Sequence, residues 1–358
     1  MSGIQEQAYQ FQLSGTPMFC TNYGNGHINE TYLVLDTRAN LYILQKINKD
    51  VFTNPEALMK NVAAVAAYLK ERSTTPRDEV TLVPTLDGKD WLVDSHGEYW
   101  RMYNFISYAV CLEQASTPAE FRESGFAFGD FQRKLAEFPA HTLAETIPHF
   151  HDTPKRFETF RAAVAADKMG RAKDVEREIE FTLAREEYAS TLMDKQRSGE
   201  LPLRVTHNDT KLNNVLLDCD THKTLCVLDL DTVMPGLSVT DFGDSIRFGA
   251  STATEDEKDL DKVTMSLELL SAYTEGFLRA CGKSLTDCEL AHLADGAKMM
   301  TLECGTRFLT DYLQGDAYFR THYEGHNLDR CRTQYKLVAD METKWSDMQV
   351  IIEREARK

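Results

Sequence analysis

The chain has 358 residues, of which 42% are hydrophobic and 10% aromatic, so it is long enough for a packed core and too long for a single small one. Its formal net charge of -16 argues against nucleic acids and anionic membranes as partners. The eight cysteines form no C-x-x-C pair, and no apolar run approaches the roughly 18 residues of a membrane span. Since the N-terminus also lacks the pattern of a signal peptide, we expect a cytoplasmic protein with reduced thiols, and a monomer.

The first 106 residues have the pattern of a small, strand-rich lobe. Short runs of β-branched and aromatic residues between turn residues predict strands, and Leu58, Val62, Val65 and Leu69 recur at helical spacing. The predicted strands cover residues 31–35, 41–45, 80–84, 91–93 and 99–106, and the predicted helix covers 55–72.

Residues 107–358 are mostly helical in pattern. A helix start at Thr117-Pro118-Ala-Glu120 combines an N-cap residue, proline in the first turn and glutamate three residues after the cap. Helical periodicity covers residues 117–137, 155–165, 174–197, 255–281, 286–314 and 327–356, and a strand-rich insertion lies at 203–233.

The insertion contains four polar residues at a recognisable spacing. The segment His207-Asn-Asp-Thr-Lys-Leu-Asn-Asn214 supplies Asp209, Lys211 and Asn214, and Asp229 follows fifteen residues later. This order matches the pattern H-x-D-x-K-x-x-N followed by a metal-binding Asp, as in kinases. We expect Asp209 to accept the proton of an attacking hydroxyl and Lys211 to neutralise the moving phosphoryl group. Asn214 and Asp229 are expected to hold Mg²⁺ against the nucleotide.

A polar turn between two strands is the simpler interpretation, because Asp and Asn cap local structure. It explains one or two of these residues, but not four at matching offsets with strand-like runs on both sides. Together with the element pattern, the motif predicts an α+β protein with the bilobal protein-kinase-like fold. Residues 1–106 would then be a β-rich nucleotide-binding lobe, and residues 107–358 a larger helical lobe for catalysis and acceptor binding.

The nucleotide side is predicted from weaker signals. Gly24 and Gly26 lie in a turn whose backbone N–H groups can approach phosphate, although an ordinary hairpin turn uses the same residues. Asn104 and Ile106 end the strand expected to pair with adenine, and a plain core strand is equally compatible with them. A further strand, 41–45, ends where a kinase has its phosphate-binding lysine. Alignment puts Gln45 there and leaves open whether Gln45 or Lys46 contacts phosphate.

The motifs resemble those of the aminoglycoside phosphotransferase and choline kinase superfamily, and the resemblance spans nearly the whole chain. It rests on the catalytic segment and on Leu228-Asp-Leu-Asp231. Longer strings are similar to superfamily members that phosphorylate the anomeric hydroxyl of N-acetylglucosamine and N-acetylgalactosamine with ATP and Mg²⁺. These strings are Tyr23-Gly-Asn-Gly-His-Ile-Asn29, His149-Phe-His-Asp-Thr-Pro154, Arg204-Val-Thr-His-Asn-Asp-Thr-Lys-Leu-Asn-Asn214, Asp241-Phe-Gly-Asp-Ser-Ile-Arg-Phe-Gly-Ala250 and Glu303-Cys-Gly-Thr-Arg-Phe-Leu309.

The resemblance implies ATP and an N-acetylhexosamine as ligands. It implies that Asp209 is the base, that Asn214 and Asp229 are metal ligands, and that His27, Arg307 and Tyr318 hold the sugar. Each sugar residue has a simpler interpretation. Helix ion pairs with carboxylates four residues away are the alternative for Arg307, a core position for Tyr318, and a plain turn for His27.

Two other functions remain open from the sequence. One is a kinase for another small alcohol of the choline, homoserine or aminoglycoside type, with an acidic or aromatic cage for a cation. The other is a catalytically inactive nucleotide-binding protein. Such a protein is expected to lose Asp209, Asn214 or Asp229, and all three are present. Only Gln45 favours it.

Overall fold

The computed structural model describes residues 3–24 and 28–358. The chain forms two compact units, each built from segments that are separated in sequence. Unit 1 comprises residues 1–110, 137–148 and 216–234, and unit 2 comprises residues 111–136, 149–215 and 235–358. The assignment of nucleotide binding to residues 1–106 and of acceptor binding to 107–358 stays a prediction.

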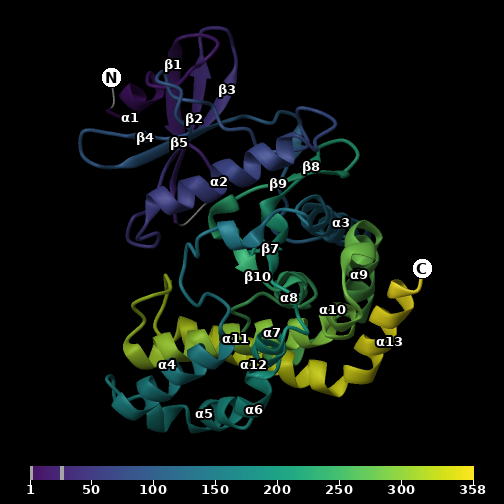
Figure 1. Cartoon of the computed structure of the whole chain (residues 1–358). Coiled ribbons are helices and arrows are strands. Elements are labelled where there is room, and N and C mark those ends of the chain that lie inside the picture. Colours follow the sequence, from purple (N-terminus) through teal and green to yellow (C-terminus); the bar gives the residue numbers. More distant parts are fainter. Residues whose placement is uncertain (1–2, 25–27) are drawn as a thin grey trace. The chain divides into compact units, whose positions relative to one another are not determined.

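Unit 1 contains an antiparallel five-stranded sheet with the strand order β1-β2-β3-β5-β4 (Figure 1). One face packs on a core that includes Val34, Leu44 and Met102. Helix α2 begins at Pro55, and Asn54 caps it by accepting a hydrogen bond from the Ala57 backbone N–H. The unit's first elements are α1 (Gly3–Ala8), β1 (Pro17–Asn22), β2 (Glu30–Asp36), β3 (Leu41–Lys46), α2 (Pro55–Lys70), β4 (Leu92–Val93) and β5 (Tyr99–Asn104).

The predicted strand at residues 80–84 is wrong. Only a single bridge forms there, between Leu82 and Tyr103, because this segment contacts β5 through Val83 N–H and the Thr81 carbonyl and then reaches Pro84, which has no N–H to donate. The edge strand β1, in contrast, was not predicted. Three further strands form a small sheet in the order β6-β8-β9: β6 (Ala109–Val110), β8 (Val215–Asp218) and β9 (Thr224–Val227).

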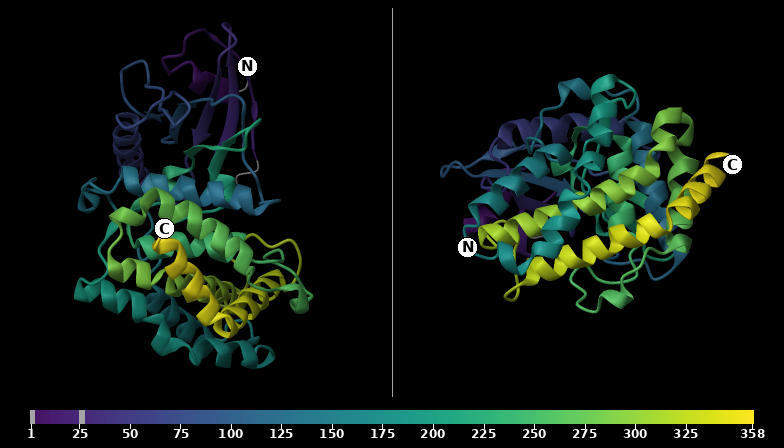
Figure 2. Two further views of the ribbon diagram at one scale, coloured as in Figure 1. Left: turned by 90° about the vertical axis from the view of Figure 1, so that its right-hand side faces the viewer. Right: turned by 90° about the horizontal axis from the view of Figure 1, so that it is seen from below.

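Unit 2 is mostly helical, and α11 and α12 run side by side in it (Figures 1 and 2). The strands β7 (Arg204–Thr206) and β10 (Met234–Gly236) pair with each other. The helices are α3 (Pro118–Lys134), α4 (Thr153–Ala166), α5 (Glu176–Leu183), α6 (Glu186–Ala189), α7 (Thr191–Ser198), α8 (Ser238–Gly249), α9 (Leu267–Cys281), α10 (Asp287–Ala291), α11 (Leu293–Gln314), α12 (His326–Thr343) and α13 (Trp345–Ala356).

Four predicted helices differ from the structure, since the segments 286–314 and 327–356 are each divided into two helices, at His292 and Lys344. The helix predicted over 174–197 is three short helices, with breaks at Arg185 and Ser190. The helix predicted over 255–281 begins only at Leu267, because Ser266 caps it there by accepting a hydrogen bond from the Leu269 N–H. The preceding charged segment is irregular, and its apolar side chain Val263 is buried.

Helix α8 was not predicted, and it matters most for the site. It crosses α11 at very short range, since a Cβ on Gly296 would lie 1.9 Å from the Val239 carbonyl oxygen. Only glycine permits that approach, so the crossing point of α8 is set by α11.

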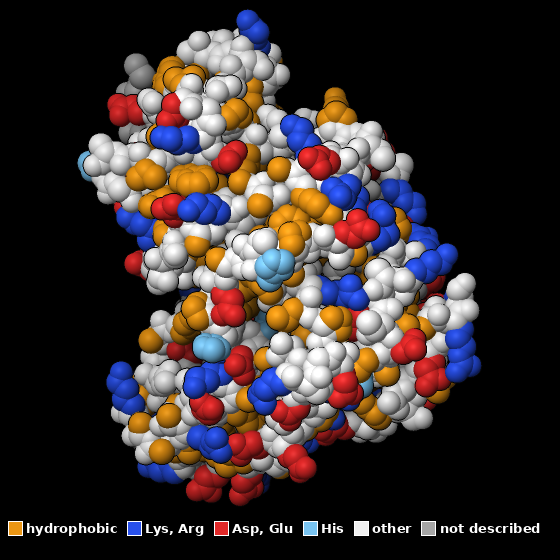
Figure 3. Space-filling view, viewed as in Figure 1, with side chains coloured by type: hydrophobic (Ala, Val, Ile, Leu, Met, Phe, Trp, Pro, Cys, Tyr) orange, Lys and Arg blue, Asp and Glu red, His pale blue; other side chains and the backbone are white. Residues whose placement is uncertain are grey.

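No helix of the described residues is long and apolar enough to cross a membrane. On the face seen in Figure 3, acidic and basic side chains are interspersed.

Candidate active site

The segment after β7 is anchored to helix α8 by one buried carboxylate. Asp241 accepts hydrogen bonds from the backbone N–H groups of His207 and Asn208, both at 2.8 Å, and from the Gln132 side chain at 3.0 Å. The Thr210 hydroxyl donates to the Asp241 carbonyl at 2.6 Å. Asp241 therefore holds the backbone on both sides of Asp209 in one conformation.

Aromatic packing fixes the same segment from another side. The His207 ring contacts Phe128 and Phe131 of α3 edge-on, with ring centroids 5.4 and 5.7 Å apart. Asn208 has a φ of 64°, a left-handed conformation that Asn adopts more readily than most residues. The backbone therefore turns sharply just before Asp209.

The three predicted residues of this loop are brought together. Lys211 Nζ lies 2.8 Å from Asp209 Oδ1, and the Asn214 amide donates to the Asp209 carbonyl at 2.8 Å and to Oδ2 at 3.1 Å. Burial raises the pKa of the Asp209 carboxyl, but Lys211 and Asn214 outweigh it and leave the pKa below its ordinary value. The Asp209 carboxylate in turn raises the pKa of Lys211. Asp209 is therefore an anion near neutral pH.

A second row of residues supports the loop from α8. Asp244 accepts from the Thr210 N–H at 3.2 Å and pairs with Arg247 at 2.9 Å, and Arg247 also reaches Glu255 at 2.8 Å. Arg247 is buried, and both of its carboxylate partners lie within unit 2. Asp244 and Arg247 therefore have a structural role beneath the loop.

Asp229 lies in unit 1, at the start of the short turn Leu230–Thr232. It has a φ of 56°, so its backbone is left-handed. Two hydrogen bonds hold the next residues: Thr146 donates to the Asp231 carbonyl at 3.0 Å, and the Asn61 amide of α2 donates to the Val233 carbonyl at 3.1 Å. The turn that presents Asp229 is thus fixed to α2 and to residues 137–148.

The donor chemistry of this chain fits Mg²⁺. Among the described residues there is no group of three or more His, Cys, Asp or Glu side chains suited to a metal ion. Mg²⁺ commonly takes one or two protein oxygen ligands and completes its shell with water and phosphate, so a carboxylate and an amide are sufficient. The side-chain nitrogen of Asn214 donates to Asp209, so the side-chain oxygen of Asn214 is the atom that can bind a metal ion.

The structure describes only some of the residues in the predicted glycine turn and at the end of β5. Gly24 has a φ of 77°, which glycine adopts without strain. Gly26 and His27 lie outside the described residues. Asn104 is the exposed last residue of β5, and its N–H donates to the Thr81 carbonyl at 3.0 Å, whereas Ile106 follows β5 and is half-buried.

Arg307 does not form the helix ion pairs that were its simpler interpretation. Among the described residues it has no carboxylate within ion-pair distance, and its guanidinium instead faces the rings of Phe150, Tyr318 and Phe319, 5.4 to 5.9 Å from their centroids. Glu303 and Asp311 have other partners: Glu303 binds His151 and Thr153, and Asp311 accepts the N–H groups of residues 317–319. The core position considered for Tyr318 is wrong, because 66% of this residue is exposed.

A buried pair, His151 and Glu303, connects the helix that carries Arg307 to the loop that carries Asp209. His151 Nδ1 lies 3.0 Å from Glu303, and His151 Nε2 lies 3.2 Å from the Asn208 carbonyl. Burial lowers the pKa of His151, but Glu303 and the Asn208 carbonyl outweigh it and raise the pKa above its ordinary value. Glu303 lies one helical turn before Arg307 on α11. Through Glu303 and His151, the helix that carries Arg307 therefore contacts Asn208, the residue before Asp209. Asp241, His151 and Glu303 lie within the quoted strings, but no spacing rule assigned them a role.

The Phosphotransferase enzyme family matches residues 20–268. Among solved structures, the chain is similar to a microcompartment-associated aminopropanol kinase, with 17% identity, a TM-score of 0.60, and 96% and 97% of the two chains covered. An amicoumacin kinase in complex with AMP-PNP, Ca²⁺ and Ami has 14% identity and a TM-score of 0.63, covering 92% of this chain and 91% of its own.

Choline kinase from Cryptosporidium parvum has 12% identity and a TM-score of 0.58, with 95% and 93% of the two chains covered. These identities are low, so the solved structures establish the fold. They confirm the predicted α+β, protein-kinase-like fold class, with a small antiparallel sheet and a larger helical part. Because the family match covers most of the chain, this protein belongs to the Phosphotransferase enzyme family.

Proposed function

We propose that the protein is an ATP-dependent N-acetylhexosamine 1-kinase. It transfers the γ-phosphoryl group of ATP to the C1 hydroxyl of N-acetylglucosamine or N-acetylgalactosamine. The observation that carries the phosphotransferase chemistry is the contact of Asp209 with Lys211 and Asn214 on a loop anchored by Asp241. The acceptor rests on the longer sequence strings and on the unpaired, ring-framed guanidinium of Arg307.

The reaction needs one proton acceptor and one bond exchange. The C1 oxygen forms a bond to the γ-phosphorus, the bond from that phosphorus to the β–γ bridging oxygen breaks, and ADP leaves. The C1 hydroxyl proton goes to Asp209, whose carboxyl is ionised near neutral pH. Lys211 neutralises the negative charge of the phosphoryl group in transfer.

Asn214 and Asp229 would hold Mg²⁺, which when bound offsets charge on the β- and γ-phosphates. The family match and the amicoumacin kinase that binds AMP-PNP with Ca²⁺ support a divalent metal. Residues 1–106, with Gly24, Gly26, Asn104 and Ile106, would bind the nucleotide. These assignments rest on the motif positions of the residues.

Arg307 and Tyr318, with His27, would bind the sugar. A guanidinium without a carboxylate partner keeps its five N–H donors for ring hydroxyls or an acetamide carbonyl. The surrounding rings of Phe150, Tyr318 and Phe319 offer flat apolar faces for a pyranose. A cationic acceptor such as choline would meet the positive charge of Arg307, which disfavours the choline-type alternative.

The test is product identification. The purified protein is incubated with ATP, Mg²⁺ and N-acetylglucosamine or N-acetylgalactosamine, and the product is examined by ³¹P and ¹H NMR for phosphate on C1. Parallel reactions contain choline, homoserine and an aminoglycoside, and Asp209→Asn is the inactive control. Turnover of one of these acceptors without turnover of either sugar would reject the sugar kinase and keep the phosphotransferase.

A further inference from the structure

A buried arginine lies on strand β5 of the sheet in unit 1. Among the described residues, Arg101 and Arg247 are the only two Lys or Arg residues that are almost completely buried. Arg247 is paired with Asp244 and Glu255. Arg101, on β5, is 1% exposed and belongs to unit 1 together with Asp229 and Asp231.

Strand register sets the position of Arg101. Gln45, the residue that aligns with the kinase phosphate-binding lysine, lies directly opposite Arg101 on the neighbouring strand. Arg101 Nε donates to Gln45 Oε1 at 3.0 Å, and Gln45 Nε2 donates to Thr31 Oγ1 at 3.1 Å. Opposite residues of an antiparallel pair share one face of the sheet, so the guanidinium occupies the place that a lysine at position 45 would reach.

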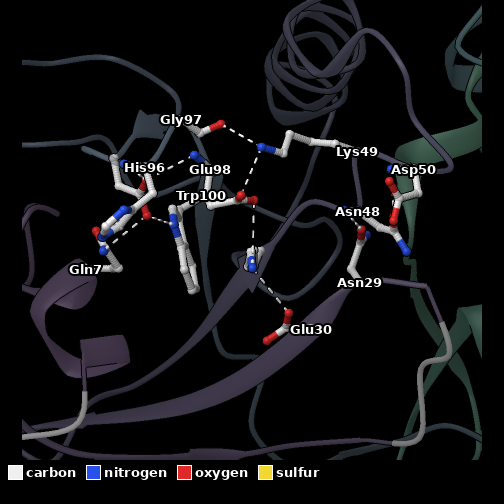
Figure 4. A network of polar contacts seen from close by, with 12 residues as sticks. Gln7, Asn29, Glu30, Asn48, Lys49, Asp50, His96, Gly97, Glu98 and Trp100 are labelled. Atoms are coloured by element: carbon white, nitrogen blue, oxygen red, sulfur yellow. Dashed lines mark hydrogen bonds and ion pairs between the residues drawn. The ribbon is translucent and has the colours of Figure 1, made fainter.

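Lys46 is excluded from this place by strand alternation. Its ammonium lies on the other face, 3.4 Å from Glu30 and 3.7 Å from Glu98. Figure 4 shows that Glu98 also interacts with Lys49, so this face has its own network of exposed charges. The single lysine at the end of β3 is therefore not available to the face that holds Gln45.

The anionic surroundings of Arg101 keep it charged and oriented. Its Nη1 binds the Asp231 carboxylate, whose other oxygen accepts from the Asn29 amide at 2.5 Å. Burial lowers the pKa of Arg101, but the charges of Asp231 and Asp229 outweigh it and raise the pKa. Nη2 donates to no partner among the described residues, so the guanidinium retains N–H donors for a phosphate oxygen.

We propose that Arg101 binds the nucleotide phosphates, in the role that the β3 lysine has in other kinases. The proposal rests on the proposed function, since it assumes a nucleotide as substrate. A guanidinium suits this role because it forms directed hydrogen bonds to phosphate oxygens and remains protonated even when buried. Asp231 acts as the counter-ion that holds the guanidinium before the nucleotide arrives.

The test separates phosphate binding from a purely structural ion pair. Binding of adenosine and of ADP is measured by calorimetry, in the presence of a chelator so that metal ligands do not contribute. The variants are Arg101→Gln, Asp231→Asn and the double variant Arg101→Gln/Asp231→Asn. The double variant leaves no unpaired buried carboxylate and so guards against loss of the fold. Lys46→Gln is the matched control on the other face.

The proposal predicts that Arg101→Gln and the double variant bind ADP about tenfold or more weakly, because a hydrogen bond to a charged group is lost. Adenosine affinity should stay within about twofold. Asp231→Asn should weaken ADP binding by less than about threefold, since Gln45 still holds the Arg101 guanidinium, and Lys46→Gln should be unchanged.

Equal losses for adenosine and ADP, or a loss in Asp231→Asn as large as in Arg101→Gln, would overturn the proposal in favour of a structural pair. Unchanged ADP binding in the double variant would also overturn it, while leaving the kinase assignment intact. A wild-type protein that binds neither nucleotide would instead reject the proposed function, and the role of Arg101 with it.

Discussion

Gln45 and Arg101 face each other across strands β3 and β5, joined by a hydrogen bond of 3.0 Å from Arg101 Nε to Gln45 Oε1. A neutral amide thus occupies the position that aligns with the kinase lysine, and the cation comes from the next strand. The departure at Gln45 was the one feature that favoured a catalytically inactive protein. A guanidinium at the same place removes that argument.

The Asp209→Asn substitution should lower kcat by about 100-fold or more, because removing a general base typically costs roughly 10²- to 10⁴-fold. The expected readout is ATP-dependent sugar phosphorylation at saturating substrates, with circular dichroism as a check on folding. Asp220→Asn, in an exposed turn, is the matched control. A kcat near that of the wild type in Asp209→Asn would remove Asp209 from its assigned role.

The contribution of the Asn214 amide to metal binding can be measured by comparing variants of Asn214 and of its neighbour Asn213. Activity should disappear with a chelator and return with Mg²⁺, and Asn214→Ala should raise the Mg²⁺ concentration needed for half-maximal activity by roughly tenfold, the effect of losing about 1.4 kcal/mol. Asn213→Ala is the control, because Asn213 donates instead to Glu113 at 3.1 Å. Phosphorylation that persists in the chelator would contradict the metal assignment.

Asp241→Ala should destabilise the protein and slow catalysis together. It leaves the buried N–H groups of His207 and Asn208 without their acceptor, at about 1–3 kcal/mol each. We expect the free energy of unfolding in urea to fall by roughly 2–4 kcal/mol and kcat to fall more than about tenfold. Gln132→Leu, which removes only a side-chain donor to Asp241, should cost less in both measurements. Wild-type kcat in Asp241→Ala would show that the loop holds its conformation without this anchor.

The His151–Glu303 pair should make stability fall on the alkaline side. The pKa of His151 is raised from its ordinary 6.5, so the folded state retains a proton that the unfolded state loses above that pH. The stabilisation is fully present below pH 6.5 and is lost as the pH rises through the folded-state pKa, with a slope of at most about 1.4 kcal/mol per pH unit. The pKa of Glu303 is lowered from 4.5, so the stabilisation that Glu303 contributes is present above pH 4.5 and is lost as the pH falls through its folded-state pKa.

Urea unfolding of wild type and His151→Gln from pH 5 to pH 9 measures this dependence. The stability difference between them should be largest near pH 5–6 and should shrink as the pH rises. The exposed His141→Gln serves as the control. A difference that does not change with pH would mean that His151 binds no extra proton in the folded state.

Arg307→Met should raise KM for the sugar by about tenfold or more, with little change in KM for ATP, because it removes charged hydrogen bonds but keeps an apolar side chain. Stability should change little, since Arg307 has no carboxylate partner among the described residues. The exposed Arg161→Met, on α4, is the control. If KM for ATP rises instead of KM for the sugar, Arg307 belongs to the nucleotide site.

The sequence predicted which polar side chains of the loop after β7 lie together, while their chemical roles stay predictions. Asp209, Lys211 and Asn214 are within five residues of one another, so local backbone geometry is enough to bring them together, as the contacts of 2.8 to 3.1 Å confirm. The long helices were predictable for a similar reason, because burial of one face imposes a repeat that is visible along the chain. The predicted α+β, kinase-like fold class is therefore confirmed, while cytoplasmic location and the monomeric state stay predictions.

Tertiary structure decided the rest, because it depends on neighbours distant in sequence. Helix α8 is buried nearly all round although it contains the charged residues Asp241, Asp244 and Arg247, which a sequence pattern places at the surface, and its position follows from the close crossing of Gly296 with Val239. Asp241 anchors a loop more than thirty residues before it in the chain. Arg101 meets Gln45 across 56 residues only because β3 and β5 pair in that register. A motif reveals which groups are present within a short segment, whereas strand register and helix packing decide which distant groups join them.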